Sequence, residues 1–286
     1  MLRNRRRLLE LFDSPMIPPS EQISKNTIQD EKGVGTVDRV DRADRVNMGS
    51  RKILVFLPTY NEKGNLDRLG EQILSMGPEY SLLIVDDQSP DGTGEIADQL
   101  AKEHPGRVEV IHRAPPRGRG LAGRDGLRRA SETDCDIIVE MDADFSHRPE
   151  DIPKLIEAIH DADVVLGSRY RPGGGTEGFG PRRRLNSRVA GLLSRLALGL
   201  RYSDPTSGFR AFRREALASL PWDRFLSDGP SIVGETLYAL RKRGYRIAEV
   251  PIIFVERRVG ESKISPKLIL KWIFNLIRIR LNRHCL

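Results

Sequence analysis

The 286-residue chain is long enough for one large α/β domain or two small ones, and its 38% hydrophobic and 30% charged residues are typical of a soluble globular protein. Its formal net charge of +7 indicates anionic partners, but the basic residues are not interleaved with aromatic ones, which argues against nucleic acid. Two cysteines give neither a disulfide framework nor a zinc-binding spacing, and no stretch approaches the roughly 18 uninterrupted apolar residues of a membrane span.

Residues 1–50 differ in composition from the rest of the chain. The basic cluster Arg3–Arg7 is followed by only a short apolar stretch, broken by Glu10, which is not typical of a signal peptide. Aromatic residues are few, and Asp-Arg triplets repeat over residues 38–46. Such a segment buries too little apolar surface to offset the entropy lost on folding, so we predict a disordered extension over residues 1–50.

From Lys52 onward, apolar runs alternate with helical patterns. Strands are predicted at 53–57, 82–85, 107–112, 137–141 and 163–167, and helices at 65–76, 93–104, 121–131 and 149–160. Continuous apolar strands alternating with helices are typical of a parallel sheet covered on both faces. We therefore predict an α/β domain over residues 51–264, with ligands bound outside the carboxyl ends of the strands.

The second half of this domain is more basic. After the glycine-rich Gly173–Gly175, a helix is predicted because apolar side chains recur on one face, namely Leu185, Val189, Leu192, Leu193, Leu196 and Leu200. Further predictions are a strand at 207–212, a helix at 233–243 and a strand at 245–255. Because Pro251 interrupts the last strand, it should lie at an edge or a bulge. The loop that follows has three cations suited to clamping a phosphate, Arg257, Arg258 and Lys263.

Acidic residues follow three of the predicted strands. Glu62 comes after the first, Asp86 and Asp87 end the second, and Asp142 and Asp144 end the fourth. Side chains at i and i+2 of a strand share a face, so the last two carboxylates are expected to lie together. Mg2+ and Mn2+ prefer oxygen ligands and join carboxylates to substrate phosphates. Each Asp alone is equally well explained as a turn former or helix cap, but the cluster predicts a metal–diphosphate site.

Residues 118–123 fit G-x-G-x-x-G, the fingerprint of dinucleotide-binding proteins. That fingerprint belongs at the first strand–helix turn, with an acidic residue at the end of the next strand. Here it follows the third predicted strand, and the apolar Met141 stands about twenty residues later, where the acid is expected. We therefore interpret this motif as a tight loop packed against neighbouring substrate-binding loops.

The C-terminal residues 265–286 are predicted to form an amphipathic helix. Its polar stripe is Lys267, Lys271, Asn275, Arg278 and Asn282, and its apolar face is Leu268, Ile269, Trp272, Ile273, Leu276, Ile277 and Ile279. A wide apolar face with a tryptophan and basic residues is typical of a helix lying in a membrane interface. Packing on the sheet or on a second subunit explains the pattern equally well.

Six motifs occur in order between residues 52 and 264. They are Leu57–Glu62, Val85–Asp87 with Ser89–Thr93, Asp142–Asp144 with Ser146 and His147, Gly167–Tyr170, Ser207–Arg210, and Gly260–Lys263. Together they resemble the GT-A glycosyltransferases of family 2 and, within them, the dolichol- or polyprenol-phosphate mannosyltransferases. The resemblance implies a Rossmann-like, mostly parallel sheet flanked by helices. It departs from the family pattern at Gln88, where glycine is frequent, and at Glu256, where aspartate is common.

The resemblance also implies an activity and its site. The expected enzyme transfers mannose, with inversion, from GDP-mannose to dolichyl or polyprenyl phosphate, peripherally at the cytoplasmic face of a membrane. The implied donor-binding residues are Pro58, Tyr60, Glu62, Val85, Asp87, Asp142, Ala143, Asp144 and Arg169. Asp142 and Asp144 would hold Mg2+ or Mn2+. Arg257, Arg258 and Lys263 would bind the acceptor phosphate, and Asp144, Arg257 and Lys263 are the implied catalytic residues.

The acceptor class can also be argued from chemistry. Inverting transfer to a hydroxyl needs a general base, and many family-2 enzymes have a Glu-Asp pair where this chain has Glu235 and Thr236. A phosphate monoester, with a second pKa of about 6, is already a nucleophilic anion at neutral pH. The missing base therefore favours a phosphate acceptor. The alternatives are UDP-glucose or another nucleotide sugar as donor, and a non-catalytic nucleotide- or lipid-phosphate-binding module, against which the retained Asp142, Asp144 and Lys263 argue.

Overall fold

The computed structural model describes residues 51–256 and 266–281, all within the second of the two units into which the chain divides, Arg45–Leu286. The predicted extension at residues 1–50 therefore lies outside the described residues, as do Arg257, Arg258 and Lys263. Among the described helices, none combines the length and apolar character needed to cross a bilayer.

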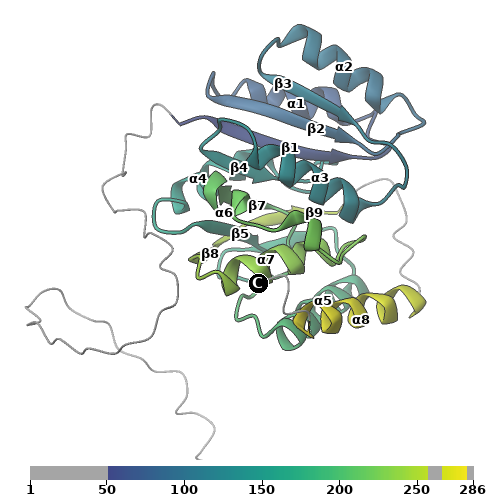
Figure 1. Cartoon of the computed structure of the whole chain (residues 1–286), viewed down its shortest axis with the longest axis vertical. Coiled ribbons are helices and arrows are strands. Elements are labelled where there is room, and N and C mark those ends of the chain that lie inside the picture. The colour runs from purple at the N-terminus through teal and green to yellow at the C-terminus, as the bar shows by residue number, and fades with distance from the viewer. Residues whose placement is uncertain (1–50, 257–265, 282–286) are drawn as a thin grey trace, which may run out of the picture. The chain divides into compact units, whose positions relative to one another are not determined.

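A seven-stranded sheet forms the centre of the domain (Figure 1). Its strands are β1 (Ile53–Thr59), β2 (Tyr80–Asp86), β3 (Val108–His112), β4 (Ile137–Glu140), β5 (Val164–Ser168), β7 (Arg210–Arg213) and β8 (Ile247–Pro251). They lie in the order β3-β2-β1-β4-β7-β5-β8. Strand β7 runs antiparallel to both of its neighbours, and all other pairs are parallel. This confirms the predicted fold class, a mostly parallel α/β sheet.

Helices cover both faces of the sheet, as the buried strands predicted (Figure 1). One face packs against α1 (Leu66–Leu74), α2 (Thr93–Glu103) and α4 (Ile152–Ala158), which follows the 3-10 helix η2 (Pro149–Asp151). The other packs against α3 (Arg119–Ser131), α6 (Arg214–Ala218) and α7 (Ile232–Lys242), joined by α5 (Pro181–Leu198) and α8 (Pro266–Leu281); the 3-10 helix η3 (Trp222–Arg224) follows α6. Successive β1 side chains alternate between the two cores, with Leu54 and Phe56 in one and Val55 and Leu57 in the other.

Two predicted strands differ from the observed ones. The strand predicted at 207–212 begins only at Arg210, because Ser207 to Phe209 form a turn in which the Ser207 hydroxyl accepts from the Phe209 N–H. The strand predicted at 245–255 is divided after Pro251. Its first part, β8, is the edge strand, as predicted, and its second part, β9 (Ile253–Val255), pairs with β6 (Gly175–Glu177) in a separate two-stranded sheet.

The two predicted amphipathic helices, α5 and α8, pack against each other. In α8, Leu276 and Ile279 are buried in the core, so part of the helix packs on the domain, and its association with a membrane stays a prediction. The predicted apolar face of α5 is largely exposed instead. Exposed apolar side chains on the two helices are Leu185, Val189, Leu192, Leu196, Phe274, Ile277 and Leu281.

Candidate functional site

The carboxyl ends of β1, β2 and β4 meet at one edge, because the three strands are adjacent and parallel. After each strand one non-glycine residue has a left-handed backbone, Asn61 (φ 60°), Gln88 (φ 58°) and Phe145 (φ 59°). This conformation is costly for a residue with a Cβ atom and persists where surrounding contacts enforce it, as at binding sites. Gln88, which replaces a frequent family glycine, is held by its Nε2 donating to the Arg113 carbonyl at 2.8 Å.

The carboxylate of Asp86 is used within its own loop. It accepts from the Ser89 hydroxyl at 2.5 Å and from the Ser89 N–H at 3.0 Å, and the Thr59 hydroxyl lies 3.3 Å away. These contacts are those of a turn former, the alternative considered for every strand-end Asp. Asp91 similarly accepts from the Thr93 N–H at the start of α2. Hydrogen bonds within the loop therefore account for these two carboxylates without an external cation.

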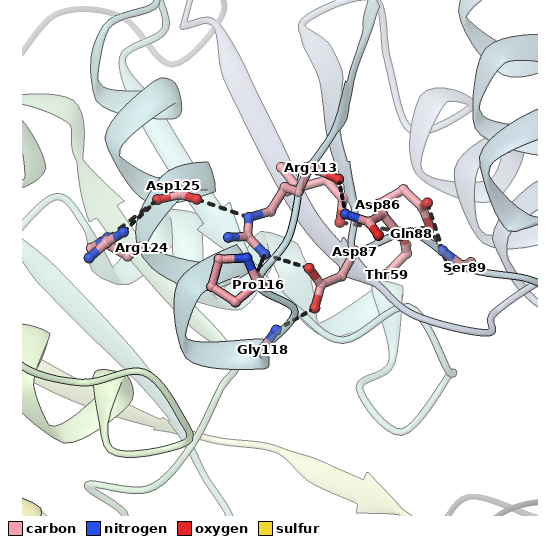
Figure 2. A network of polar contacts seen from close by, with 11 residues as sticks. Thr59, Asp86, Asp87, Gln88, Ser89, Arg113, Pro116, Gly118, Arg124 and Asp125 are labelled. Carbon is pink, nitrogen blue, oxygen red and sulfur yellow. Dashed lines mark hydrogen bonds and ion pairs between the residues drawn. The ribbon is translucent and has the colours of Figure 1, made fainter.

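Asp87, a predicted donor-binding residue, joins three segments of the chain (Figure 2). Its carboxylate accepts from Arg113 Nη1 and, at 2.7 Å, from the Gly118 N–H just before α3. Arg113 Nε also donates to Asp125 at 2.9 Å, and the side chains of Asp87 and Arg113 are each 7% exposed. The network fixes Asp87 beside the edge at which the carboxyl ends of β1, β2 and β4 meet. Arg113 was not predicted, since no motif marks it.

The G-x-G-x-x-G segment is not a loop, because all of it after Gly118 forms the first turns of α3; the interpretation as a tight loop is therefore wrong, although the segment does pack against a neighbouring loop. A Cβ atom on Gly120 would lie 2.3 Å from the Gly229 nitrogen and 2.5 Å from the Asp228 carbonyl carbon. The glycine therefore permits backbone-to-backbone contact between the start of α3 and the loop before α7. A bound dinucleotide is not needed to explain it.

The end of β1 and the loop after it contain three predicted donor-binding residues. Tyr60 is 46% exposed, with the Arg117 guanidinium 5.6 Å from its ring centroid. Glu62 is buried, and its carboxylate accepts from Asn65 Nδ2 at 2.9 Å. Pro58 is partly exposed at the end of β1. Of these side chains, Tyr60 is the one most accessible to a ligand.

The end of β4 presents Asp142 and Asp144. The Asp142 N–H donates to His147 Nδ1 at 3.1 Å, and Asp144 Oδ1 accepts from the Ser146 N–H at 2.9 Å. Burial lowers the pKa of His147, in keeping with a neutral ring that accepts at Nδ1. The carboxylate of Asp142 pairs with Arg119, which sequence reasoning missed. Two carboxylates thus lie one residue apart in one short loop.

Three residues that the resemblance implied as donor-binding have side chains that are buried or already paired. Val85 and Ala143 are buried in the core, which leaves their backbone groups for any ligand contact. Arg169 donates through Nε and Nη2 to Asp204, both at 2.7 Å, and its side chain is 11% exposed. The charge of Arg169 is therefore already matched by a fully buried carboxylate. Asp204 lies outside every motif that the sequence pointed to.

Further arginines lie next to Arg169. A cavity of about 240 Å³ is lined by Arg169, Tyr170, Gly174, Gly175, Thr176, Arg184 and Arg188. Arg184 and Arg188 are on α5, one helical turn apart, and neither was predicted. The concentration of positive charge suits an anionic ligand.

The predicted acceptor cations lie outside the described residues, but the strand that precedes them is fixed to the Asp142–His147 loop. The Val255 N–H of β9 donates to the Ser146 carbonyl at 2.9 Å. The rings of Phe254 and His147 meet edge to face, with centroids 5.2 Å apart. Val255 is thus held near the end of β4, one residue before Glu256, where the described part of this segment ends.

The model of the family described as "Glycosyl transferase family 2" matches residues 54–220, more than half of the chain. The chain is 41% identical over 227 residues to the "Undecaprenyl-phosphate mannosyltransferase" of Micrococcus luteus, covering 79% of this chain and 93% of that protein. It is 41% identical over 243 residues to the "Polyprenol monophosphomannose synthase" of Mycolicibacterium smegmatis, covering 82% and 90%.

A more distant relative and a solved structure extend these matches. The "Dolichol-phosphate mannosyltransferase" of Pyrococcus furiosus is 39% identical over 233 residues, which cover 80% of this chain and 63% of that protein. Glucosyl-3-phosphoglycerate synthase from Mycobacterium tuberculosis, solved with phosphoglyceric acid, has a TM-score of 0.60 and 22% identity over 80% of each chain. The same enzyme solved with Mn2+, uridine diphosphate and phosphoglyceric acid also gives 0.60, at 23% identity over 80% and 78%. At this identity the likeness is one of fold.

Proposed function

Because the chain belongs to glycosyl transferase family 2, we propose that it transfers mannose from GDP-mannose to a polyprenyl or dolichyl phosphate, with inversion at the anomeric carbon. Membership of the family confirms the resemblance seen in the six motifs and the prediction that the protein is a glycosyltransferase. The names of the three relatives support mannose as the sugar and a polyprenyl-type phosphate as the acceptor. GDP as the donor nucleotide rests on the motifs.

The observation that carries a phosphate acceptor concerns the start of α7. The Glu235 carboxylate, fully buried, accepts from the Leu226 N–H at 2.8 Å and from the Ser227 N–H at 2.9 Å. Thr236 is also fully buried, and its hydroxyl donates to the Ile232 carbonyl at 2.8 Å. Neither side chain is placed to take a proton from an acceptor. The residues here suit an acceptor that needs no deprotonation.

The reaction then balances without a proton transfer. An oxygen of the phosphate monoester dianion forms a bond to the anomeric carbon of mannose, while the bond from that carbon to the β-phosphate oxygen breaks. The electron pair leaves on GDP, and the product is polyprenyl-phosphate mannose. The barrier depends on stabilising the charge that develops on the diphosphate.

The end of β4 fits a divalent cation, Mg2+ or Mn2+. Asp142 and Asp144 provide carboxylate oxygens, and the Ser146 hydroxyl oxygen beside them is buried with no hydrogen-bond partner among the described residues. Within the described residues no group of three or more His, Cys, Asp or Glu is arranged to hold a metal ion. Mg2+ is usually held by one or two carboxylates together with substrate phosphates and waters. When bound, the cation would offset the negative charge of the leaving diphosphate.

One assay tests the proposal. Purified protein is supplied with short-chain polyprenyl phosphate, Mn2+ and each of GDP-mannose, UDP-glucose and other nucleotide sugars, and glycosyl-lipid is measured. Glycosyl-lipid formed with GDP-mannose and with none of the other donors supports the proposal. Product with another donor alone overturns the assigned donor, and nucleotide release without polyprenyl phosphate overturns the assigned acceptor.

The Asp144→Ala variant tests the cation site. Loss of a charged ligand should lower turnover by about 100-fold or more while the fold is retained, since Asp144 lies in a loop outside the core. Circular dichroism checks the fold, and Asp134→Ala, which removes a carboxylate that is 82% exposed and precedes β4, at the opposite end of that strand from Asp144, is the matched control. Normal turnover of Asp144→Ala contradicts the assignment.

The same proposal includes peripheral binding at the cytoplasmic face of a membrane, where a polyprenyl phosphate is embedded. The apolar side chains exposed on α5 and α8 support it, as does a hollow of about 420 Å³ lined by Leu226, Phe274, Ile277, Arg278 and Leu281. Apolar walls beside an arginine suit an isoprenoid chain with an anionic head.

A further inference from the structure

A half-exposed arginine at the end of β4 has no role in the function proposed above. Arg119, the first residue of α3, donates through Nη2 to the carboxylate of Asp142, 23 residues later in the chain. The Arg119 side chain is 51% exposed and that of Asp142 is 19% exposed. The guanidinium therefore meets solvent at the carboxylate assigned to the cation and the diphosphate.

The backbone on both sides of Arg119 is fixed. The Gly118 N–H is bound to Asp87, and Gly120 is packed against the backbone of Gly229. Arg119 thus projects from a rigid base, and only its own side-chain torsions need to change for the guanidinium to move. A short displacement would carry it from Asp142 to another anion at the same edge.

Negative charge surrounds this guanidinium. Asp142, Glu140 and Asp144 all raise the pKa of Arg119, and Asp142 has the largest effect. On the remaining side lies Gly208, where a Cβ atom would come 3.3 Å from Arg119 Nη2 and 3.9 Å from Asp142 Oδ1. Glycine at this position lets the backbone lie close to the ion pair with no side chain over it.

A divalent cation and Arg119 compete for Asp142, because both are positive. A half-exposed ion pair is weak and is exchanged at little cost. Once displaced, the guanidinium needs another anion, and its planar fork matches phosphate oxygens better than any other side chain does. A nucleoside diphosphate held by the cation provides those oxygens within the same site.

We propose that Arg119 is a further donor-binding residue, which holds Asp142 in the donor-free enzyme and moves to the donor diphosphate when the divalent cation takes its place. The proposal rests on the function proposed above, because it requires a nucleoside diphosphate at the end of β4. Under this proposal the cation and the nucleotide bind cooperatively. When the cation binds alone, it displaces the Arg119 guanidinium from Asp142 and leaves it without an anionic partner, whereas a bound nucleotide provides that partner.

Two binding measurements on Arg119→Leu test this, and neither depends on turnover. Mn2+ affinity without nucleotide, followed by the electron paramagnetic resonance of free Mn2+, should become about two- to fivefold tighter. GDP affinity at saturating Mn2+, measured by calorimetry, should become about tenfold weaker, as expected for loss of a charge-assisted hydrogen bond. Arg128→Leu removes the same charge from an exposed position of the same helix and should leave both affinities unchanged.

The outcomes separate this inference from the proposed function. If wild-type protein binds GDP with Mn2+ and Arg119→Leu changes neither affinity, Arg119 has no such role and the proposed function stands. Weaker GDP binding without tighter Mn2+ binding contradicts the competition for Asp142. Wild-type protein that binds no nucleoside diphosphate overturns the proposed function and this inference together.

Discussion

Arg210 has the largest side chain among the fully buried residues of the described chain. Its Nε donates to Glu140 at 3.0 Å, its Nη2 makes a second bond to the same carboxylate, and its Nη1 donates to the Val233 carbonyl at 3.0 Å. Glu140 and Arg210 are register partners across β4 and β7. The pair thus joins β4, two residues before Asp142, to β7 and α7.

Breaking this pair should be costly, because a buried charge without a partner is strongly unfavourable. Arg210→Met is expected to lower the free energy of unfolding by about 3–5 kcal/mol, measured by urea denaturation. The double variant Arg210→Met with Glu140→Leu should recover much of that loss, since it leaves no orphaned carboxylate. A single variant that loses less than about 1 kcal/mol would contradict a structural role for the pair.

Individual residues differ in how far the sequence reveals their roles. That Asp142 and Asp144 follow a buried strand was predictable because an apolar run marks β4, but both lie in the loop after the strand, where strand geometry does not set a common face. Arg113 and Arg119 were not predictable, since their partners Asp87 and Asp142 lie 26 and 23 residues away and no periodic pattern links them. Left-handed backbone at Gln88 was equally hidden, because it follows from contacts that form only on folding.

Close backbone contact at Gly120 positions the start of α3 against the loop before α7. Gly120 allows α3 to contact the loop at Asp228–Gly229, whereas a Cβ atom on Gly123 would meet only Ile232 Cγ2, at an ordinary 3.6 Å. The two glycines of a single motif therefore have different structural demands.

Substituting each glycine by alanine tests this difference. Gly120→Ala should destabilise the protein by about 1–3 kcal/mol, because backbone atoms must shift to admit the methyl group. Gly123→Ala, the matched control, should be neutral or stabilise by up to about 1 kcal/mol, since alanine favours helix. Thermal unfolding measures both effects. Equal effects of the two substitutions would show that the close approach at Gly120 has no energetic weight.

Elements with strong local patterns were predicted from the sequence, and those defined by distant pairing were not. The strands of the first half and their helices follow from apolar runs and helical periodicity. The late start of β7 was missed because Ser207–Phe209 alternate like a strand but form a turn. Its antiparallel insertion between β4 and β5 depends on pairing across about 70 residues, which no local pattern shows. The division of β8 from β9 was partly visible, since Pro251 marked an interruption.

At the scale of the whole molecule, the apolar surface on α5 and α8 calls for a test of the proposed membrane binding. Deleting α8 is a poor test, because Leu276 and Ile279 are buried and their removal would uncover the core. Substitution of exposed residues avoids this problem. Leu196 is 69% exposed on α5, and Phe274 is 65% exposed on α8.

The double variant Leu196→Glu with Phe274→Glu should bind vesicles containing anionic lipid at least about tenfold more weakly than wild type, because apolar contact is lost and negative charge is added. Co-sedimentation measures binding. Lys102→Glu, on the exposed face of α2, lowers the net charge by the same two units at a position away from these helices and is the control. Equal sedimentation of the double variant and wild type would refute membrane docking through α5 and α8.

The position of β7 in the sheet has a consequence for the newly synthesised chain. Strands β3, β2, β1 and β4 are complete once residue 140 has left the ribosome, but the strand that pairs with β4 comes only at residues 210–213. Over that interval β4 has an unpaired edge, which can pair with another nascent chain. Glu140 meanwhile lacks the arginine that will pair with it, and an unpaired charge on an edge strand disfavours such pairing. We therefore expect Glu140, which stabilises the folded enzyme, also to reduce aggregation of the nascent chain.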